Sequence, residues 1–145
     1  MKKFISCIML IMIVLSAVSM WTFAEDNPEA VPPERRASYL IEAASCRLVC
    51  SGRSLTASCT VNATSTPDKI GVTSFSIQEK RDGDWVSVKS VKDQYCYNVM
   101  NYTGGLTYTG RKGYEYRAVA NFYVKDGSLT DTGSEISSVK TISNT

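Results

Sequence analysis

The stretch YEYRAVANFYV, residues 114–124, carries the clearest sign of a β fold in this sequence. Apolar or aromatic residues occupy every second position, while Glu115 and Arg117 lie between them. A repeat of two residues is the period of a β-strand, whose successive side chains point to opposite faces of a sheet. Because one face of this strand is entirely apolar, we expect it at the centre of a sheet that packs against a second layer.

Further segments on either side have the composition or the alternation of strands, and turn residues separate them. Asp82-Gly83 is the clearest turn, because these residue types accept the positive φ angles of a tight hairpin. No segment beyond residue 24 shows sustained helical periodicity. The sequence therefore predicts an all-β fold, an antiparallel two-sheet β-sandwich. The other predicted strands are residues 38–50, 55–61, 72–80, 85–91, 106–109 and 135–142.

Single residues can be assigned within these strands. Val86 and Val88 are the expected inward pair of the strand that follows the Asp82-Gly83 turn.

Residues 113–116, Gly-Tyr-Glu-Tyr, resemble the G-x-x-Y approach to the penultimate strand of fibronectin type III domains. Tyr116 could then form a tyrosine corner, in which the hydroxyl bonds back to nearby backbone. The alternative is an ordinary core tyrosine.

The first 24 residues have the pattern of a secretory signal peptide, which would form a helix. Lys2 and Lys3 supply the positive start, and Ala24 marks the expected cleavage position. The apolar run of about fifteen residues is shorter than the roughly 20 that a spanning helix needs, so we expect no membrane association after cleavage. Residues 25–35 have the composition of a disordered linker, and residues 36–143 form the predicted β-sandwich domain. We expect a secreted, extracellular protein.

The balance of charge excludes two classes of partner. The chain has 16 basic and 14 acidic residues, and loss of Lys2 and Lys3 with the signal peptide makes the two numbers equal. A neutral chain without a basic run cannot neutralise many phosphates, so nucleic acid and anionic membranes are not expected partners. The expected partner is an extracellular protein or a cell-surface component. The sequence leaves the oligomeric state open.

Four cysteines follow the signal peptide: Cys46, Cys50, Cys59 and Cys96. An even number of cysteines in a short exported chain is typical of disulfide bonds. A zinc site or a thioredoxin-like redox centre is disfavoured, because the chain has no histidine and no C-x-x-C pair. We expect no metal and no cofactor.

Spacing limits how these cysteines can pair. Cys46 and Cys50 would lie about 13 Å apart on one strand, beyond the roughly 7 Å that a disulfide spans. A hairpin that turns at Gly52-Arg53 places Cys46 opposite Cys59. We therefore favour Cys46–Cys59, with Cys50–Cys96 as the second bridge. The pairing Cys46–Cys96 with Cys50–Cys59 stays open, because a slip of the hairpin register would permit it.

No arrangement of residues predicts catalysis. Without histidine, the usual serine and cysteine triads are excluded. Carboxylates beside turns, such as Asp82 and Asp84, more commonly cap backbone amides than act on substrates. The chain also lacks a glycine-rich phosphate loop. We therefore expect that the protein is not an enzyme and assign no catalytic residue.

Aromatic residues supply the candidate ligand contacts. Alternation places Trp85 on the polar face of its strand, where an indole can stack on a sugar ring or anchor a protein partner. The alternative is that Trp85 only covers the backbone of the hairpin. Tyr95, Tyr97 and Tyr102, in and beside a loop predicted over residues 96–108, are further candidates if they are exposed.

Motifs in a characteristic order extend over nearly all of residues 36–142: RASY (36–39), DKIGV (68–72), WVSVK (85–89), YTG (108–110), YRAV (116–119) and FY (122–123). With these motifs the chain resembles a family of small secreted proteins of Gram-positive bacteria whose domain has no assigned function. The resemblance implies an immunoglobulin-like or fibronectin type III-like sandwich and an extracellular location. It brings no catalytic residues, and the cysteines depart from the family pattern.

The expected function is that of a secreted, non-catalytic binding module. One alternative is a carbohydrate-binding module, which would need exposed aromatic rings in one plane. Another is a small disulfide-stapled inhibitor or toxin, which would need a rigid exposed loop. A hydrolase would need two acids about 5 to 10 Å apart in a cleft.

Overall fold

A computed structural model of the protein describes residues 39–143. The predicted signal peptide, the predicted linker and residues 36–38 lie outside the described residues. Within the described range, no helix is long and apolar enough to span a membrane. The strands of the described residues are β1 (Ile41–Ser51), β2 (Ser54–Ala63), β3 (Lys69–Arg81), β4 (Asp84–Cys96), β5 (Asn101–Thr109), β6 (Glu115–Asp126), β7 (Leu129–Ile136) and β8 (Lys140–Thr141).

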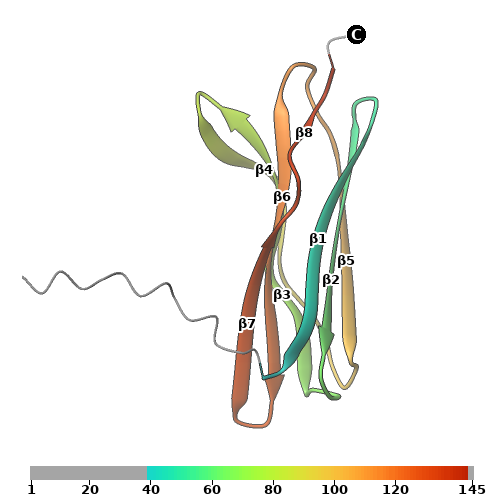
Figure 1. Cartoon of the computed structure of the whole chain (residues 1–145), viewed down its shortest axis with the longest axis vertical. Coiled ribbons are helices and arrows are strands. Elements are labelled where there is room, and N and C mark those ends of the chain that lie inside the picture. Colours follow the sequence, from blue (N-terminus) through green and yellow to red (C-terminus); the bar gives the residue numbers. More distant parts are fainter. Residues whose placement is uncertain (1–38, 144–145) are drawn as a thin grey trace, which may run out of the picture. The chain divides into compact units, whose positions relative to one another are not determined.

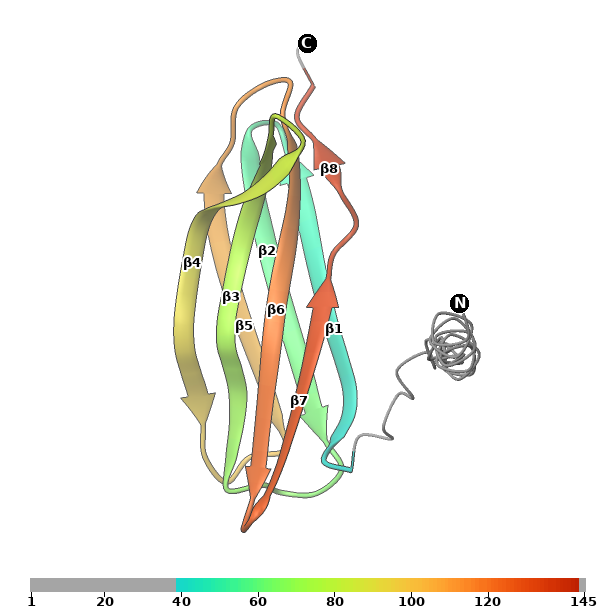
Figure 2. The same cartoon turned by 90° about the vertical axis from the view of Figure 1, so that its left-hand side faces the viewer.

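The strands form two antiparallel sheets that pack face to face (Figure 1). One sheet has three strands in the order β1-β2-β5. The other has five strands, in the order β4-β3-β6-β7, and β8 pairs with β6 beyond the end of β7. Figure 2 shows the five-stranded sheet in front of the three-stranded one. The prediction of an all-β fold with two antiparallel sheets is therefore confirmed for residues 39–143.

The core lies between the sheets, and the central strands β3 and β6 supply much of it. Alternate residues of β6 from Tyr116 to Val124 are buried, as their spacing predicts. On β3, Phe75 and Ile77 are buried and pair in register with the small residues of β6. Each fully buried large apolar side chain contributes about 1.5 to 3 kcal/mol relative to an exposed one. Strand β6, which alternates most clearly in the sequence, is thus a central strand of the five-stranded sheet, between β3 and β7.

Two-residue loops set the register of the hairpins. Gly52 has a φ of 57°, and Asp82 and Gly83 have φ values of 52° and 94°. Left-handed residues at these positions match the twist of the flanking strands, which favours the hairpin over a splayed pair. The first loop closes with Ser51 opposite Ser54, and this register runs along β1 and β2.

Two predicted segments have different bounds in the structure. Residues 135–142 were expected to form one last strand, which was wrong: the chain pairs earlier as β7, breaks at Ser137, and resumes briefly as β8. Ser137 maintains this break, because its hydroxyl accepts the N–H of Ala118 at 2.9 Å while its own N–H donates to the Ala118 carbonyl. The loop expected over residues 96–108 is mostly strand β5.

Strand β4 contains a bulge, and one of its two expected inward residues is exposed. Its register with β3 shifts between Ile77 and Gln78, so that Val88 is the extra residue. Val88 packs against the core. Val86 pairs in register with buried Glu79, so it lies on the core-side face as predicted, but it is 39% exposed rather than buried. The end of the β3–β4 hairpin also projects away from the sandwich (Figure 1).

Candidate functional site

Trp85 lies near the start of β4 on the outer face of the five-stranded sheet, on the opposite side of the strand from Val86. It pairs in register with Lys80 of β3. The guanidinium carbon of Arg117 on β6 lies 4.4 Å from the centroid of the Trp85 ring, and Nζ of Lys80 lies 5.9 Å from it. Cation–π contacts of this kind contribute about 0.5 to 1 kcal/mol at exposed sites. We call these three residues together with Gln78 the Trp85 cluster.

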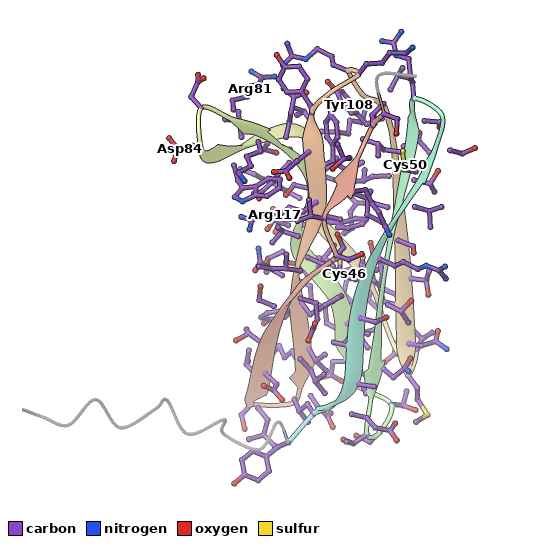
Figure 3. All side chains as sticks on the ribbon, turned by 45° about the horizontal axis from the view of Figure 1, so that its top comes forward. Cys46, Cys50, Arg81, Asp84, Tyr108 and Arg117 are labelled. Atoms are coloured by element: carbon purple, nitrogen blue, oxygen red, sulfur yellow. The ribbon has the colours of Figure 1, made fainter. Side chains whose placement is uncertain are left out.

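Arg117 retains the capacity to bind an anion. Its Nε donates to Oε1 of Gln78 at 2.8 Å, which fixes the plane of the guanidinium. Lys80 instead forms an ion pair with Glu115 at 2.9 Å. Within residues 39–143, no carboxylate forms an ion pair with Arg117. Its terminal nitrogens can therefore donate to a carboxylate from outside, in the planar geometry that suits that group. Figure 3 labels Arg117 beside the hairpin that carries Arg81 and Asp84.

Tyr95 belongs to a second aromatic group on the same outer face. Its ring and that of Tyr123 lie 5.8 Å apart in an edge-on arrangement, and Nζ of Lys69 lies 3.8 Å from the centroid of Tyr95. Both tyrosines pair in register with Gly71, whose missing side chain leaves space for them to meet. The Tyr95 hydroxyl donates to Oδ1 of Asp93 at 3.0 Å. Burial, followed by this carboxylate, raises the pKa of Tyr95.

Tyr97 and Tyr102 have opposite environments. Tyr97 is 63% exposed between β4 and β5 and remains a candidate contact. Tyr102 is partly buried, packs against the core, and its hydroxyl lies close to Gly104. Burial raises the pKa of Tyr102. The structure therefore brings Trp85 and Tyr95 to one sheet face, but it does not bring Tyr97 or Tyr102 to it.

A buried carboxylate was not predicted as a notable residue. Glu79 is fully buried, and its oxygens accept from the Tyr116 hydroxyl at 2.5 Å, from Nε of Arg81 at 2.6 Å and from the guanidinium of Arg111. The Tyr116 hydroxyl in turn accepts the Arg111 backbone N–H at 2.8 Å, which confirms the predicted bond back to nearby backbone. We call these four residues the Glu79 network. The two-residue alternation of β3 could have revealed that Glu79 is buried, because Phe75, Ile77 and Glu79 share one face.

The ionisation of the Glu79 network favours a structural role over acid–base catalysis. Burial alone would raise the pKa of Glu79, but the hydrogen bonds from Arg111, Tyr116 and Arg81 outweigh burial and lower it to about 2. The bond to Glu79 raises the pKa of Arg111, and burial raises the pKa of Tyr116. A carboxyl with so low a pKa is a poor base near neutral pH, where proton transfer needs a matched group.

The cysteines lie in three places. Cys46 pairs in register with Cys59, as predicted, and both side chains face the interior. Cys50 lies beside the β1–β2 loop, whereas Cys96 ends β4 and pairs with Ile70 at the other end of β3. About nine strand residues separate these two ends, or roughly 30 Å. The Cys50–Cys96 pairing was therefore wrong.

The alternative pairing also fails, because Cys50 lies four residues along the hairpin from the partner of Cys59, or about 13 Å away. All four cysteines are unbridged among the described residues. Burial, and then the neighbouring Cys59, raises the pKa of Cys46 to about 11, and burial raises that of Cys59. Thiols with raised pKa values exchange slowly, since the thiolate is the reactive form.

We predict that prolonged mild oxidation joins Cys46 to Cys59, whereas Cys50 and Cys96, which lie too far apart to pair, form no bridge with each other. In a hairpin closed by Ser51 and Ser54, alternation makes Cys46 and Cys59 a non-hydrogen-bonded pair, with Cα atoms about 4.5 Å apart. That distance lies within the range of disulfides. Oxidised glutathione would accept the two electrons and two protons. Mass spectrometry after alkylation should find the Cys46 and Cys59 peptides joined; recovery of both as alkylated thiols would contradict the prediction.

No metal centre emerges from the described residues. Within residues 39–143, no three His, Cys, Asp or Glu side chains are grouped closely enough to hold an ion.

A shallow pocket of about 360 Å³ lies between the β1–β2 loop and residues 141–143, where Arg53, Lys112 and Thr141 line it. The pocket is polar and open, and its lining contains no aromatic ring. The Trp85 cluster is therefore the stronger candidate for recognition.

Comparison with known proteins gives little guidance. No protein-family model matches the chain, and no curated protein matches it. Among solved structures, the chain is similar to the sporulation control protein Spo0M from Bacillus subtilis, with a TM-score of 0.36 and 10% identity over 65% of this chain. The match covers 48% of that protein, so the chain spans about half its length. At this level the similarity carries no argument about function, and the resemblance to a Gram-positive family stays a prediction.

Proposed function

We propose that the chain is a secreted, non-catalytic β-sandwich protein that binds an extracellular protein or a cell-surface component through the outer face of its five-stranded sheet. The observation that carries this proposal is the Trp85 cluster. The partly exposed indole contacts two cations, and Arg117 has no ion-pair partner among residues 39–143. Trp and Arg are the residue types most enriched at the centres of protein interfaces.

The cluster favours a partner that presents a carboxylate beside a flat or apolar group. The terminal nitrogens of Arg117 can donate hydrogen bonds to the carboxylate, while the indole offers an apolar surface to the neighbouring group. Gln78 holds the guanidinium in place before the partner arrives, which lowers the entropy lost on binding. An acidic segment of a protein has this chemistry.

The sandwich is proposed to be of the immunoglobulin-like, fibronectin type III-like kind. The order β1-β2-β5 in one sheet and β4-β3-β6-β7 in the other supports this assignment. The bond from the Arg111 N–H to the Tyr116 hydroxyl near the start of β6 also supports it, since a tyrosine corner occurs at that position of such sandwiches. The predicted signal peptide and the resemblance to secreted bacterial proteins support an extracellular location. The fold alone does not identify a partner, so the kind of partner is inferred from the chemistry of the Trp85 cluster.

An acidic carbohydrate is the second candidate, because an indole also stacks on sugar rings. Arg117 already lies over the Trp85 ring at 4.4 Å. A neutral sugar would compete with Arg117 for that face, whereas an acidic sugar would bind the guanidinium and the indole together. The chemistry therefore favours acidic polysaccharides over neutral ones.

We predict that Trp85→Ala and Arg117→Gln each weaken binding to cell envelopes by about tenfold or more, which corresponds to roughly 1.4 kcal/mol. The measurement is a pull-down of the purified protein with envelopes, with insoluble acidic polysaccharide and with insoluble neutral polysaccharide. Tyr39→Ala is the matched control, because Tyr39 is an aromatic residue that is 83% exposed and does not belong to the cluster. Equal binding by all variants, at equal thermal stability, would exclude the Trp85 cluster as the site.

A further inference from the structure

The edge strands of the two sheets differ in how they are protected. Proteins usually place charges, prolines or bulges on sheet edges, because unpaired backbone groups there invite another strand. Within residues 39–143, three edge strands carry such features. Strand β4 has a bulge and several lysines, and β1 has a bulge at Glu42 and a further charge at Arg47. Strand β7 has the charged residues Asp131 and Glu135. Edge strand β5, NYTGGLTYT, carries no charge, no proline and no register shift.

The free edge of β5 can be assigned residue by residue. Ala63 N–H donates to the Met100 carbonyl and Gly110 N–H donates to the Arg53 carbonyl, so the even-numbered residues at both ends of β5 direct backbone groups toward the β1–β2 hairpin. Backbone groups of a strand alternate between its two sides. The odd-numbered residues therefore direct their N–H and C=O groups away from β2, to the open side. These residues are Asn101, Thr103, Gly105, Thr107 and Thr109.

The sequence of β5 reads nearly the same in both directions around Gly105. Thr103 and Thr107 lie two residues to either side of it, and Tyr102 and Tyr108 lie three to either side. An antiparallel copy centred on Gly105 would place each threonine opposite the other threonine and each tyrosine opposite the other tyrosine. Threonine pairs and aromatic pairs are among the favourable cross-strand contacts, and no like charges would face one another.

We propose that β5 is a dimerisation edge, at which two copies of this chain pair antiparallel about a two-fold axis through Gly105. The two three-stranded sheets then become one six-stranded sheet. Gly105 exchanges both of its backbone hydrogen bonds with Gly105 of the second copy, and about ten backbone hydrogen bonds form in total. Such an interface is isologous and closes on itself, so pairing stops at two copies.

The side chains near the axis are compatible with this contact. The Gly105 position is exposed and open: a Cβ there would meet nothing nearer than the Ala57 carbonyl oxygen at 3.9 Å. Tyr102 and Tyr108 are only partly buried in one copy. Pairing would cover the remainder of each ring with the tyrosine of the other copy. This surface is separate from the Trp85 cluster, so the dimer and the proposed function can fail independently.

Charge at the two-fold axis tests the proposal directly. In the dimer, Gly105→Lys would place two ammonium groups opposite each other, and Gly105→Glu would place two carboxylates there. Each variant alone should be monomeric in light scattering coupled to size-exclusion chromatography, over a concentration series in which the unchanged protein is dimeric. An equal mixture of the two variants should recover the dimer, because lysine then faces glutamate.

Ser58→Lys is the matched control, since Ser58 pairs with Gly105 on the same sheet face but lies one strand inside the edge. It should dimerise like the unchanged protein. A monomeric unchanged protein at every concentration would overturn the proposal. A dimer that persists in both charge variants would also overturn it, and would place the contact on another surface.

Discussion

Glu79→Ala is expected to lower the free energy of unfolding by about 3 kcal/mol. The substitution removes the acceptor of the Tyr116 hydroxyl proton in a fully buried position, and it leaves a cavity where the carboxylate was. The side chains of Arg111 and Arg81 are 48% and 44% exposed, so water can solvate them after the change. The cost therefore comes mainly from the buried hydroxyl and the cavity. Urea denaturation at pH 7 measures it.

Glu115→Ala is the matched control for this effect. Glu115 also forms an ion pair, with Lys80 at 2.9 Å, but both side chains are more than 40% exposed. Exposed pairs contribute about 0 to 1 kcal/mol, so this variant should change stability little. Equal losses in the two variants would contradict a special role for the Glu79 network.

The pH dependence of stability separates the charge of Glu79 from its shape. Because the pKa of Glu79 falls from 4.5 to about 2 on folding, its contribution is complete above pH 4.5 and is lost as the pH falls toward 2. The unchanged protein should lose about 2 kcal/mol through this group in that range. Glu79→Gln keeps the shape but not the charge, so that part of the acid sensitivity should disappear. An identical acid profile in Glu79→Gln would show that other carboxyls cause it.

Gly71→Ala is expected to destabilise the protein by about 3 kcal/mol, because the added methyl group has no space. A Cβ at Gly71 would overlap the carbonyl oxygen of Gln94 and lie 2.8 Å from Cα of Tyr95. These are backbone atoms of β4, so a side-chain rotation cannot relieve the overlap. Part of β4 must move away from β3, which should also separate Tyr95 from Tyr123. Denaturation measures the loss, and hydrogen exchange should show faster exchange at the end of β4.

Gly133→Ala on β7 is the control for Gly71→Ala. Its Cβ would lie 3.5 Å from Cδ1 of Ile41, which is an ordinary contact distance. Stability should change by less than about 1 kcal/mol, with a small gain possible from the less flexible unfolded chain. If Gly71→Ala were tolerated equally well, β4 would not lie as close to β3 as the structure places it.

Local rules predicted the parts of the fold that depend on neighbours in sequence. The alternation of β6 is visible because one of its faces is entirely buried. The pairing of Cys46 with Cys59 follows from a two-residue loop, since such a loop fixes every later pair in the hairpin. The polar-face position of Trp85 follows from the same period of two.

Other features depend on contacts that no local pattern records. β7 was placed too late because it is an exposed edge strand whose polar residues show no alternation. The bulge at Val88 has no signature in residue type. Val86 lies on the predicted face but is exposed, because the end of the β3–β4 hairpin extends beyond the sandwich (Figure 1). The pairing of Cys50 with Cys96 assumed that leftover cysteines meet, which the length of β3 prevents. The partners of Glu79 on β3 include Arg111 and Tyr116, more than 30 residues later in the chain.

The contact between Arg117 and Trp85 gives the protein a spectroscopic signal of its own. The chain has two tryptophans, and Trp85 is the only one within residues 39–143. A guanidinium 4.4 Å from an indole centroid alters the field that the excited ring experiences. A ligand that draws Arg117 away would shift the emission of Trp85 without any added dye. Screening for partners therefore needs only a fluorimeter, with Arg117→Gln as the reference spectrum.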